Sequence, residues 1–240
     1  MKLARKMSWA LLGLSVLTLV LLVRGTNGAI VPAESNSTQI PDVVVWDEAS
    51  QKISLWDKLR EGGNSPVIVL PIYTRCTTSC PLVTRKLKEE TPRMGGGSDY
   101  RVLLFSFDSS EDAESLREFR EREQLPANWM LVRAGDAGIR RFCDFFHYSI
   151  MTEGAVLIHP NEIFLLDRDL HWRATLIDVD WDAAKLQTWM DRIESPGISG
   201  WVAMNPGKLV WIGLGGLSAG LLLTLCWLIW RRPSGRSATA

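Results

Sequence analysis

The chain has 240 residues and a formal net charge of zero. This length accommodates one medium-sized domain with additional segments, or two small domains. A hydrophobic fraction of 46% is too low for a polytopic membrane protein, and a charged fraction of 22% excludes disorder over the whole chain. Four cysteines are too few for a disulfide-rich scaffold.

The zero net charge averages over segments of unlike charge. Residues 41–194 hold more Asp and Glu than Lys and Arg, whereas residues 1–24 and 208–240 carry basic side chains and no acidic one. Nucleic-acid-binding surfaces are rich in basic residues, so an acidic central region disfavours that function. We therefore expect no nucleic-acid partner.

An uncharged apolar run over residues 7–23 follows three basic residues near the N-terminus. This pattern is typical of a signal peptide or of an uncleaved signal anchor, which we place at residues 1–29. Cleavage after Ala29 would put Asn27 at the −3 position, where a small residue is preferred. The sequence thus favours an uncleaved anchor over a cleaved peptide.

A second uncharged run covers residues 209–230, and as a helix it would extend roughly 33 Å, enough to cross a bilayer. Two arginines follow directly and begin a cytoplasmic tail, 231–240. With both basic ends in the cytoplasm, the domain at 43–194 must lie on the periplasmic or extracytoplasmic side of the cell membrane. Residues 30–42 and 195–208 are rich in Gly, Pro, Ser and Asn, and we interpret them as linkers.

The domain at 43–194 alternates short apolar runs with amphipathic segments. The order predicts an α/β domain with a mixed sheet flanked by helices, large enough for a hydrophobic core. We expect strands over 66–73, 101–107, 129–132, 163–166 and 171–177, and helices over 80–92, 111–125, 136–147 and 182–193.

Two cysteines, Cys76 and Cys80, follow the expected strand 66–73 and open the next helix. The N-terminus of a helix favours anions, so a thiolate is stabilised there. Two sulfurs placed on one helix face can form a disulfide or bind one soft metal ion. Two thiolates are too few for a structural zinc site, but two thiolates with one imidazole suit copper.

The chain has three histidines that could complete such a site. His159 lies in a loop that enters a strand, at the sheet edge where the cysteines are expected. His147 follows a helix, where its side chain could act as a terminal cation. His171 adjoins a turn. The positions favour His159 and leave His147 and His171 as alternatives.

Several segments, taken in order, resemble the Sco/SenC family of copper-binding, thioredoxin-like proteins. They are IYTRCTTSCPLVTRKLKEE, LLFSFDSSEDAESLREFREREQL, WMLVRAGDAGIRRF and IHPNEIFLLDRDL. The family has a Cys-x-x-x-Cys-Pro motif after a strand, a Ser-x-Asp segment after the next strand, and a histidine before a late strand. The resemblance covers approximately residues 43–194 and implies a thioredoxin-like fold.

The resemblance implies that Cys76, Cys80 and His159 are the ligands of Cu(I) or Cu(II). Asp108 matches an acidic position that shapes the site. Family members help to build the copper A centre of cytochrome c oxidase, and some reduce disulfides on its subunit II. The chain departs from many members at Thr77, where a proline is common, at Glu162, which offers an additional carboxylate, and in its C-terminal membrane helix.

We therefore expect a membrane-tethered copper chaperone, rather than an enzyme, that delivers copper to subunit II or to another copper-receiving oxidase subunit. The alternative is a thiol-disulfide oxidoreductase that uses Cys76 and Cys80. A membrane sensor is disfavoured by the short tail, and a peroxidase by the absence of a Pro-x-x-x-Thr-x-x-Cys element. Cys143 and Cys226 look structural, and small residues at 211–216 would allow dimerisation.

Overall fold

The structure is a computed structural model that describes residues 30–33, 39–61, 63–94, 100–153, 156–194 and the single residues 218, 220 and 224. The chain divides into two compact units, residues 27–204 and residues 1–26 with 205–240. The predicted anchor and nearly all of the predicted C-terminal membrane helix lie outside the described residues. Within those described ranges, no helix is both long and apolar enough to cross a membrane.

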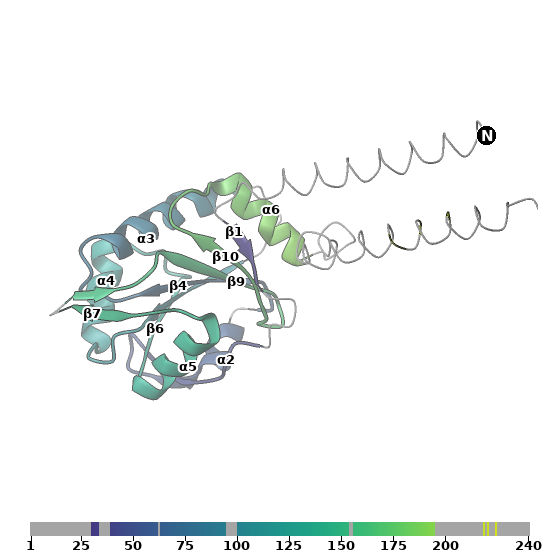
Figure 1. Ribbon diagram of the computed structural model, residues 1–240. Helices are drawn as coiled ribbons and strands as arrows, with labels where there is room; N and C mark the ends of the chain where they lie inside the picture. Colours follow the sequence, from purple (N-terminus) through teal and green to yellow (C-terminus); the bar gives the residue numbers. More distant parts are fainter. Residues whose placement is uncertain are drawn as a thin grey trace, which may run out of the picture. The chain divides into compact units, whose positions relative to one another are not determined.

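An eight-stranded mixed sheet forms the centre of the larger unit (Figure 1), in the order β1-β10-β9-β4-β5-β6-β2-β3. β4, β5 and β6 are parallel to one another, and each of the remaining neighbouring pairs is antiparallel. The strands are β1 Ile30–Pro32, β2 Val44–Asp47, β3 Lys52–Ser54, β4 Val67–Ile72, β5 Arg101–Ser106, β6 Met130–Ala134, β9 Glu162–Leu166 and β10 Trp172–Ile177.

Helices cover both faces of this sheet, with α3 and α6 over one face and α5 under the other (Figure 1). This is the mixed α/β, thioredoxin-like arrangement that the sequence predicts. The helices are α2 Leu55–Arg60, α3 Ser79–Glu90, α4 Ala113–Glu123, α5 Asp136–Phe146 and α6 Ala183–Glu194, and a short 3-10 turn η1, Thr91–Arg93, follows α3.

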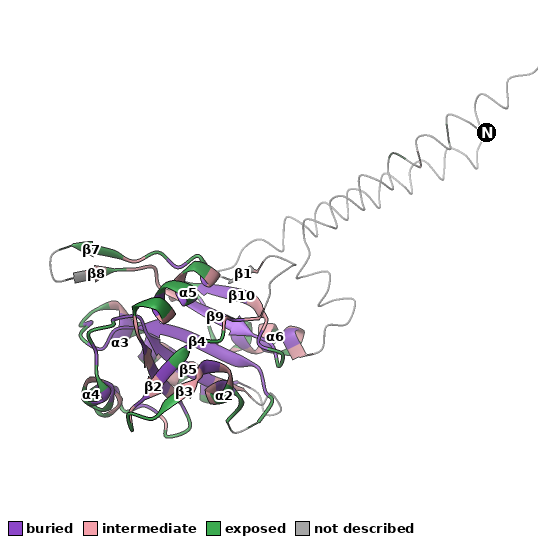
Figure 2. Ribbon diagram, turned by 90° about the horizontal axis from the view of Figure 1, so that it is seen from below, coloured by how far each residue is buried: buried purple, intermediate pink, exposed green. Residues whose placement is uncertain are grey.

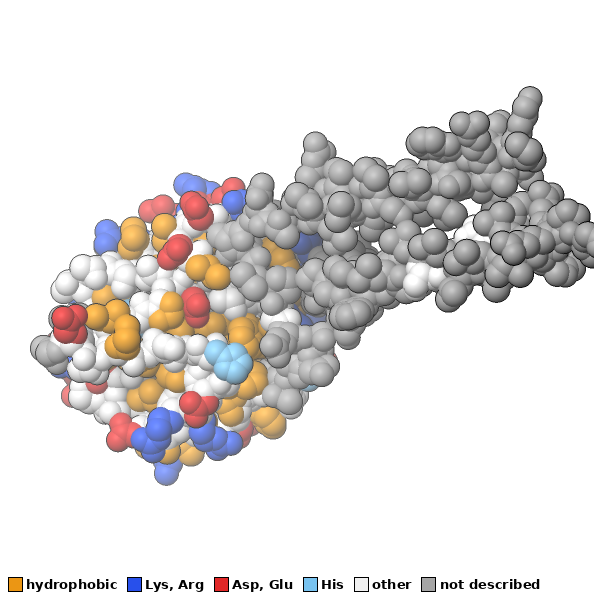
Figure 3. All heavy atoms as spheres, viewed as in Figure 1, with side chains coloured by type: hydrophobic (Ala, Val, Ile, Leu, Met, Phe, Trp, Pro, Cys, Tyr) orange, Lys and Arg blue, Asp and Glu red, His pale blue; other side chains and the backbone are white. Residues whose placement is uncertain are grey.

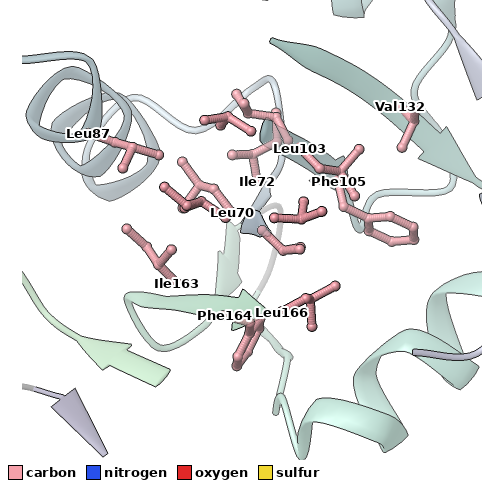
Figure 4. Packing of buried hydrophobic residues seen from close by; sticks show 14 of the residues in the cluster. Leu70, Ile72, Leu87, Leu103, Phe105, Val132, Ile163, Phe164 and Leu166 are labelled. Atoms are coloured by element: carbon pink, nitrogen blue, oxygen red, sulfur yellow. The ribbon is translucent and has the colours of Figure 1, made fainter. Parts of the chain in front are cut away.

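The core lies between the central strands and these helices (Figures 2 and 4). All six residues of β4 are buried, as are five of the six in β5, since both strands have neighbours on each side and helices above and below. Phe105 of β5 stacks on Phe142 of α5 with their ring centroids 4.0 Å apart, and Phe146 stacks on Phe164 of β9 at the same distance. Figure 4 shows β4, β5 and β9 contributing to one continuous apolar cluster.

All the strands and helices expected between residues 66 and 193 are present, with ends shifted by at most two residues. The helix expected at 111–125 begins at Ala113 because Asp112 caps it by accepting from Ser115 N–H at 2.9 Å. Glu111 is left outside the helix. The short elements β1, β2, β3 and α2 were not predicted from the sequence, and β1 lies in the segment interpreted as a linker.

A hairpin that was also not predicted from the sequence leads into the loop of His159. Its strands are β7 Met151–Glu153 and β8 Val156–Ile158, and they pair only with each other (Figure 2). His159 follows β8 directly and precedes β9. The histidine thus lies three residues before β9, a strand that is largely buried inside the sheet.

Candidate metal centre

The carboxyl ends of β4 and β5 create the place for the site. The two strands are parallel and in register, so Ile72 lies opposite Ser106 at their ends. Loops that leave such strand ends meet at one sheet edge. After β4 the chain makes a tight turn, in which Cys76 N–H donates to the Tyr73 carbonyl at 3.1 Å, and α3 then begins at Ser79.

Cys76, Cys80 and His159 converge at this edge. Their nearest ligand atoms all lie within 4.8 Å of one another, and Cys80 Sγ is 3.5 Å from His159 Nε2. Both cysteines are 2% exposed and free of any disulfide, while His159 is half-buried. The histidine is therefore the most exposed member of the group.

The sulfur of Cys76 caps the N-terminus of α3 by accepting a main-chain hydrogen bond. Thr78 occupies the N-cap position of α3 but makes no capping bond through its side chain. Instead, Cys80 N–H donates to Cys76 Sγ at 3.4 Å, and Ser79 Oγ lies 3.6 Å from the same sulfur. A hydrogen bond from the Cys80 thiol, with these donors, lowers the pKa of Cys76 to about 3 despite its burial. The hydrogen bond to Cys76 and burial raise the pKa of Cys80, so at neutral pH the pair holds one thiolate and one thiol.

The ring of His159 is oriented by Tyr148. The Tyr148 hydroxyl donates to the Pro160 carbonyl at 3.0 Å, and its oxygen lies 2.7 Å from His159 Nδ1. Nδ1 is also 2.9 Å from that carbonyl, which can only accept, so Nδ1 carries the proton. The lone pair is then on Nε2, the nitrogen that faces Cys80 Sγ and Ser79 Oγ, each at 3.5 Å.

Aromatic rings form the wall behind the imidazole. The ring centroids of Phe107, Tyr73 and Tyr148 lie 5.0, 5.8 and 6.0 Å from that of His159. All three aromatic residues are buried. Burial raises the pKa of Tyr73 to about 12 and raises that of Tyr148, so both hydroxyls stay protonated. These rings hold the imidazole between the polar partners of Nδ1, on Tyr148 and Pro160, and the sulfur of Cys80 that Nε2 faces.

The loop after β5 fastens the turn that carries Cys76. Arg75 forms an ion pair with Asp108, whose other oxygen accepts from Ser110 N–H at 2.9 Å. The hydrogen bonds from Ser110 and Arg75 outweigh burial and lower the pKa of Asp108. Asp108 therefore lies beside the site, where it holds Arg75, and the converging group does not include it.

The spacing of the three donor atoms fits one small, soft cation. With bond lengths such as zinc makes, about 2.3 Å to sulfur and 2.0 Å to nitrogen, three ligands in a plane lie roughly 4 Å apart. The distances here, from 3.5 Å up to the 4.8 Å limit, bracket that value. Two sulfurs and one imidazole form a soft, three-coordinate donor set, which Cu(I) accepts.

The other candidates from the sequence lie elsewhere. His147 is the exposed left-handed residue that ends α5, and His171 Nδ1 sits 3.4 Å from Asp167 at the turn between β9 and β10. Glu162 is the first residue of β9 and, among the described residues, belongs to no converging ligand group. Cys143 is half-buried in α5, where burial raises its pKa to about 11.

Three aromatic residues that surround the imidazole were not predicted from the sequence: Tyr148, Tyr73 and Phe107. The three come from separate segments, and nothing in their spacing marks them as partners of His159. On the face seen in Figure 3, Lys and Arg side chains are interspersed with Asp and Glu.

Comparison with solved structures supports this fold, whereas sequence comparisons find no relative. No family model matches the sequence, and no curated protein sequence matches it. Among solved structures, a protein of Aquifex aeolicus described as an electron transfer protein is 27% identical, with a TM-score of 0.59; the match covers 66% of this chain and 94% of that one.

Two Sco structures share the fold at lower identity. Arabidopsis thaliana ScoI with copper bound is 12% identical, with a TM-score of 0.56 over 65% of this chain and 98% of that one. BsSco, a member of the Sco family of cytochrome c oxidase assembly proteins, is 17% identical, with a TM-score of 0.55 over 68% and 96%. The chain thus has the thioredoxin-like fold of the Sco/SenC structures, and its resemblance to that family is confirmed at the level of the fold.

Proposed function

We propose that this protein is a Sco/SenC-family copper chaperone that holds one copper ion between Cys76, Cys80 and His159. One observation carries the proposal: two sulfurs and an imidazole nitrogen from separate segments converge within 4.8 Å. A structural disulfide would need only the two cysteines, and it would not need a histidine whose tautomer directs Nε2 at them.

Copper is the cargo rather than a permanent cofactor in this proposal. The ion must enter and leave, so at least one ligand must be within reach of a partner. His159 is half-buried, and its two companions are buried. Exchange would accordingly begin at His159, with the sulfurs released afterwards. Loss of any one ligand should weaken binding strongly, because three ligands leave no redundancy.

The proposed recipient is a copper-receiving subunit of cytochrome c oxidase, with subunit II as the first candidate. Support comes from the shared fold with BsSco, a cytochrome c oxidase assembly protein, and with a copper-bound ScoI. The apolar runs at 7–23 and 209–230 would tether the domain to the cell membrane on its extracytoplasmic side.

An anaerobic titration tests the proposal. The full chain, reduced and in mild detergent, is titrated with Cu(II) while its visible spectrum is recorded. We expect a thiolate-to-copper charge-transfer band that saturates at one copper per chain. Cys76→Ser should abolish the band, and His159→Ala should shift it and weaken retention of the ion.

Matched controls come from the half-buried Cys143 and the exposed His147. Cys143→Ser and His147→Ala each remove the same functional group at a position outside the site. Both should leave the band and the stoichiometry unchanged. If the wild-type chain shows no band and retains no copper while its thiols oxidise, the chaperone proposal is wrong.

A thiol-disulfide reductase is the second candidate, and the lowered pKa of Cys76 favours it. The Cys76 thiolate would attack a partner's disulfide, breaking that bond and forming a mixed disulfide. Cys80, after losing its proton, would then attack Cys76 Sγ and release the reduced partner, leaving a Cys76–Cys80 disulfide. Cys80→Ser should trap the mixed disulfide if this reaction occurs; its absence with an oxidase subunit bearing a disulfide would refute the reductase function.

A further inference from the structure

We propose that Glu111 and Arg122 form a clamp on the main chain of Thr74 that positions Cys76 for copper. The inference rests on the proposed copper function, but it concerns residues other than the three proposed ligands. Glu111 lies in the loop after β5, and Arg122 lies in the last turn of α4. Neither residue is near a ligand in the sequence, and neither belongs to the group of ligand atoms.

The clamp holds both polar main-chain groups of one residue. Thr74 N–H donates to Glu111 Oε1, and Arg122 Nη2 donates to the Thr74 carbonyl at 2.7 Å. The second oxygen of Glu111 accepts from Ser106 Oγ at 2.5 Å. Thr74 and Glu111 are both 4% exposed, so without these partners the main-chain groups would be buried with unmet hydrogen bonds.

Thr74 is the residue at which the turn before Cys76 can change shape. The turn runs from Tyr73 to Cys76, closed by the bond from Cys76 N–H to the Tyr73 carbonyl. The Thr74 carbonyl belongs to the central peptide of this turn. The two common turn types differ in which way that peptide points. By donating to this carbonyl, Arg122 selects one orientation and thereby one position for the Cys76 sulfur.

Glu111 holds the main-chain N–H of Thr74, the group that Arg122 does not contact. Its carboxylate joins the end of β5, through Ser106, to the residue that follows the end of β4 by two positions. An ordinary capping acid would have pointed to solvent at the start of α4, but Asp112 fills that position instead. Glu111 is thus free to turn inward. Both residues act through Thr74, so they are positioning residues and not ligands.

Arg122 gives the cleaner test because its side chain is half-exposed and its removal should not unfold the domain. Arg117 is a matched control: it lies on the same helix, its side chain is 47% exposed against 48% for Arg122, and Arg117 Nη1 also donates to a carbonyl at 2.7 Å, that of Glu48. The variants Arg122→Met and Arg117→Met are compared in the full chain, in mild detergent. Affinity for Cu(I) is measured by competition with a chelator.

We expect Arg122→Met to weaken Cu(I) affinity by about tenfold or more, as the loss of outer partners of ligands usually does, and to shift the charge-transfer band of the Cu(II) form. Arg117→Met should match the wild type in both. Glu111→Ala should weaken affinity similarly, whereas Glu111→Gln, whose amide can still accept from Thr74 N–H, should restore it to within about threefold of wild type. Rescue of this kind separates positioning from bulk stability.

Hydrogen exchange of the peptide covering residues 73–80, without copper, gives a readout independent of the proposed function. It should rise in Arg122→Met and stay unchanged in Arg117→Met. If the wild type binds no copper but this exchange difference holds, the copper function fails and the clamp stands as a device that holds Cys76. If the two arginine variants are indistinguishable in exchange, in affinity and in spectrum, the clamp is refuted.

Discussion

Removing one hydroxyl, in Tyr148→Phe, should weaken copper binding with only a modest loss of stability. The hydroxyl donates to the Pro160 carbonyl at 3.0 Å and lies 2.7 Å from His159 Nδ1. Phenylalanine fills the same space, so no cavity forms. Losing the buried hydrogen bond to the Pro160 carbonyl lowers the free energy of unfolding by about 1 kcal/mol. Losing the contact with His159 Nδ1 as well brings the total to about 2 kcal/mol.

The effect on copper is separate, because the hydroxyl orients the ligand. Outer partners of metal-binding histidines are typically worth 10–100-fold in affinity, or about 1.4–2.8 kcal/mol. Chelator competition for Cu(I) measures this term, and urea unfolding measures the stability term. Tyr100→Phe is the control, because its hydroxyl donates to the Thr91 carbonyl at 3.0 Å outside the site. Equal Cu(I) affinity for the two variants would refute the role given to Tyr148.

Three further outcomes test the site and the core. Ultraviolet thiolate absorbance of the reduced, metal-free chain should show one thiolate at neutral pH that disappears as the pH falls through about 3 and is missing in Cys76→Ser. Because folding lowers the pKa of Cys76, the stability that its thiolate contributes is complete above the ordinary value of about 9 and is lost progressively as the pH falls from there to about 3. Phe164→Ala should lower the free energy of unfolding by about 3–5 kcal/mol in urea, since its ring is fully buried and stacked on Phe146; a cost under about 1 kcal/mol would contradict the packing. Gln124→Gly should raise the free energy of unfolding by up to about 1 kcal/mol, and with it the melting temperature, because Gln124 ends α4 in the left-handed conformation, with φ 51°, which glycine adopts without strain. A lower melting temperature would show that no backbone strain is stored at this residue.

The sequence predicted the central strands and the helices between them because each signal is local. β4 and β5 are nearly continuous apolar runs, which mark strands covered on both faces. The two cysteines sit at the junction of β4 and α3, where parallel sheets gather reactive groups. The strands β2 and β3 at one side of the sheet are only four and three residues long, too short for a periodic pattern to identify them.

The surroundings of the ligands could not be predicted from local patterns. Tyr148 meets His159 only because the chain passes through the β7–β8 hairpin and returns, and the sequence carries no sign of that return. Glu111 stands in a run of acids before a helix, where acidic residues usually face solvent. Its burial depends on Asp112 taking the cap and on the strand ends lying side by side, which are both properties of the folded domain.

X-ray absorption at the copper edge of the loaded full chain tests the central claim most directly, because it counts the atoms bound to the metal. The structure predicts two sulfurs and one imidazole nitrogen around one Cu(I). His159→Ala should remove the nitrogen contribution and keep the two sulfurs, while His147→Ala should leave the spectrum unchanged. A copper ion bound by nitrogen and oxygen alone, or one sulfur in place of two, would contradict the three-ligand centre built from Cys76, Cys80 and His159.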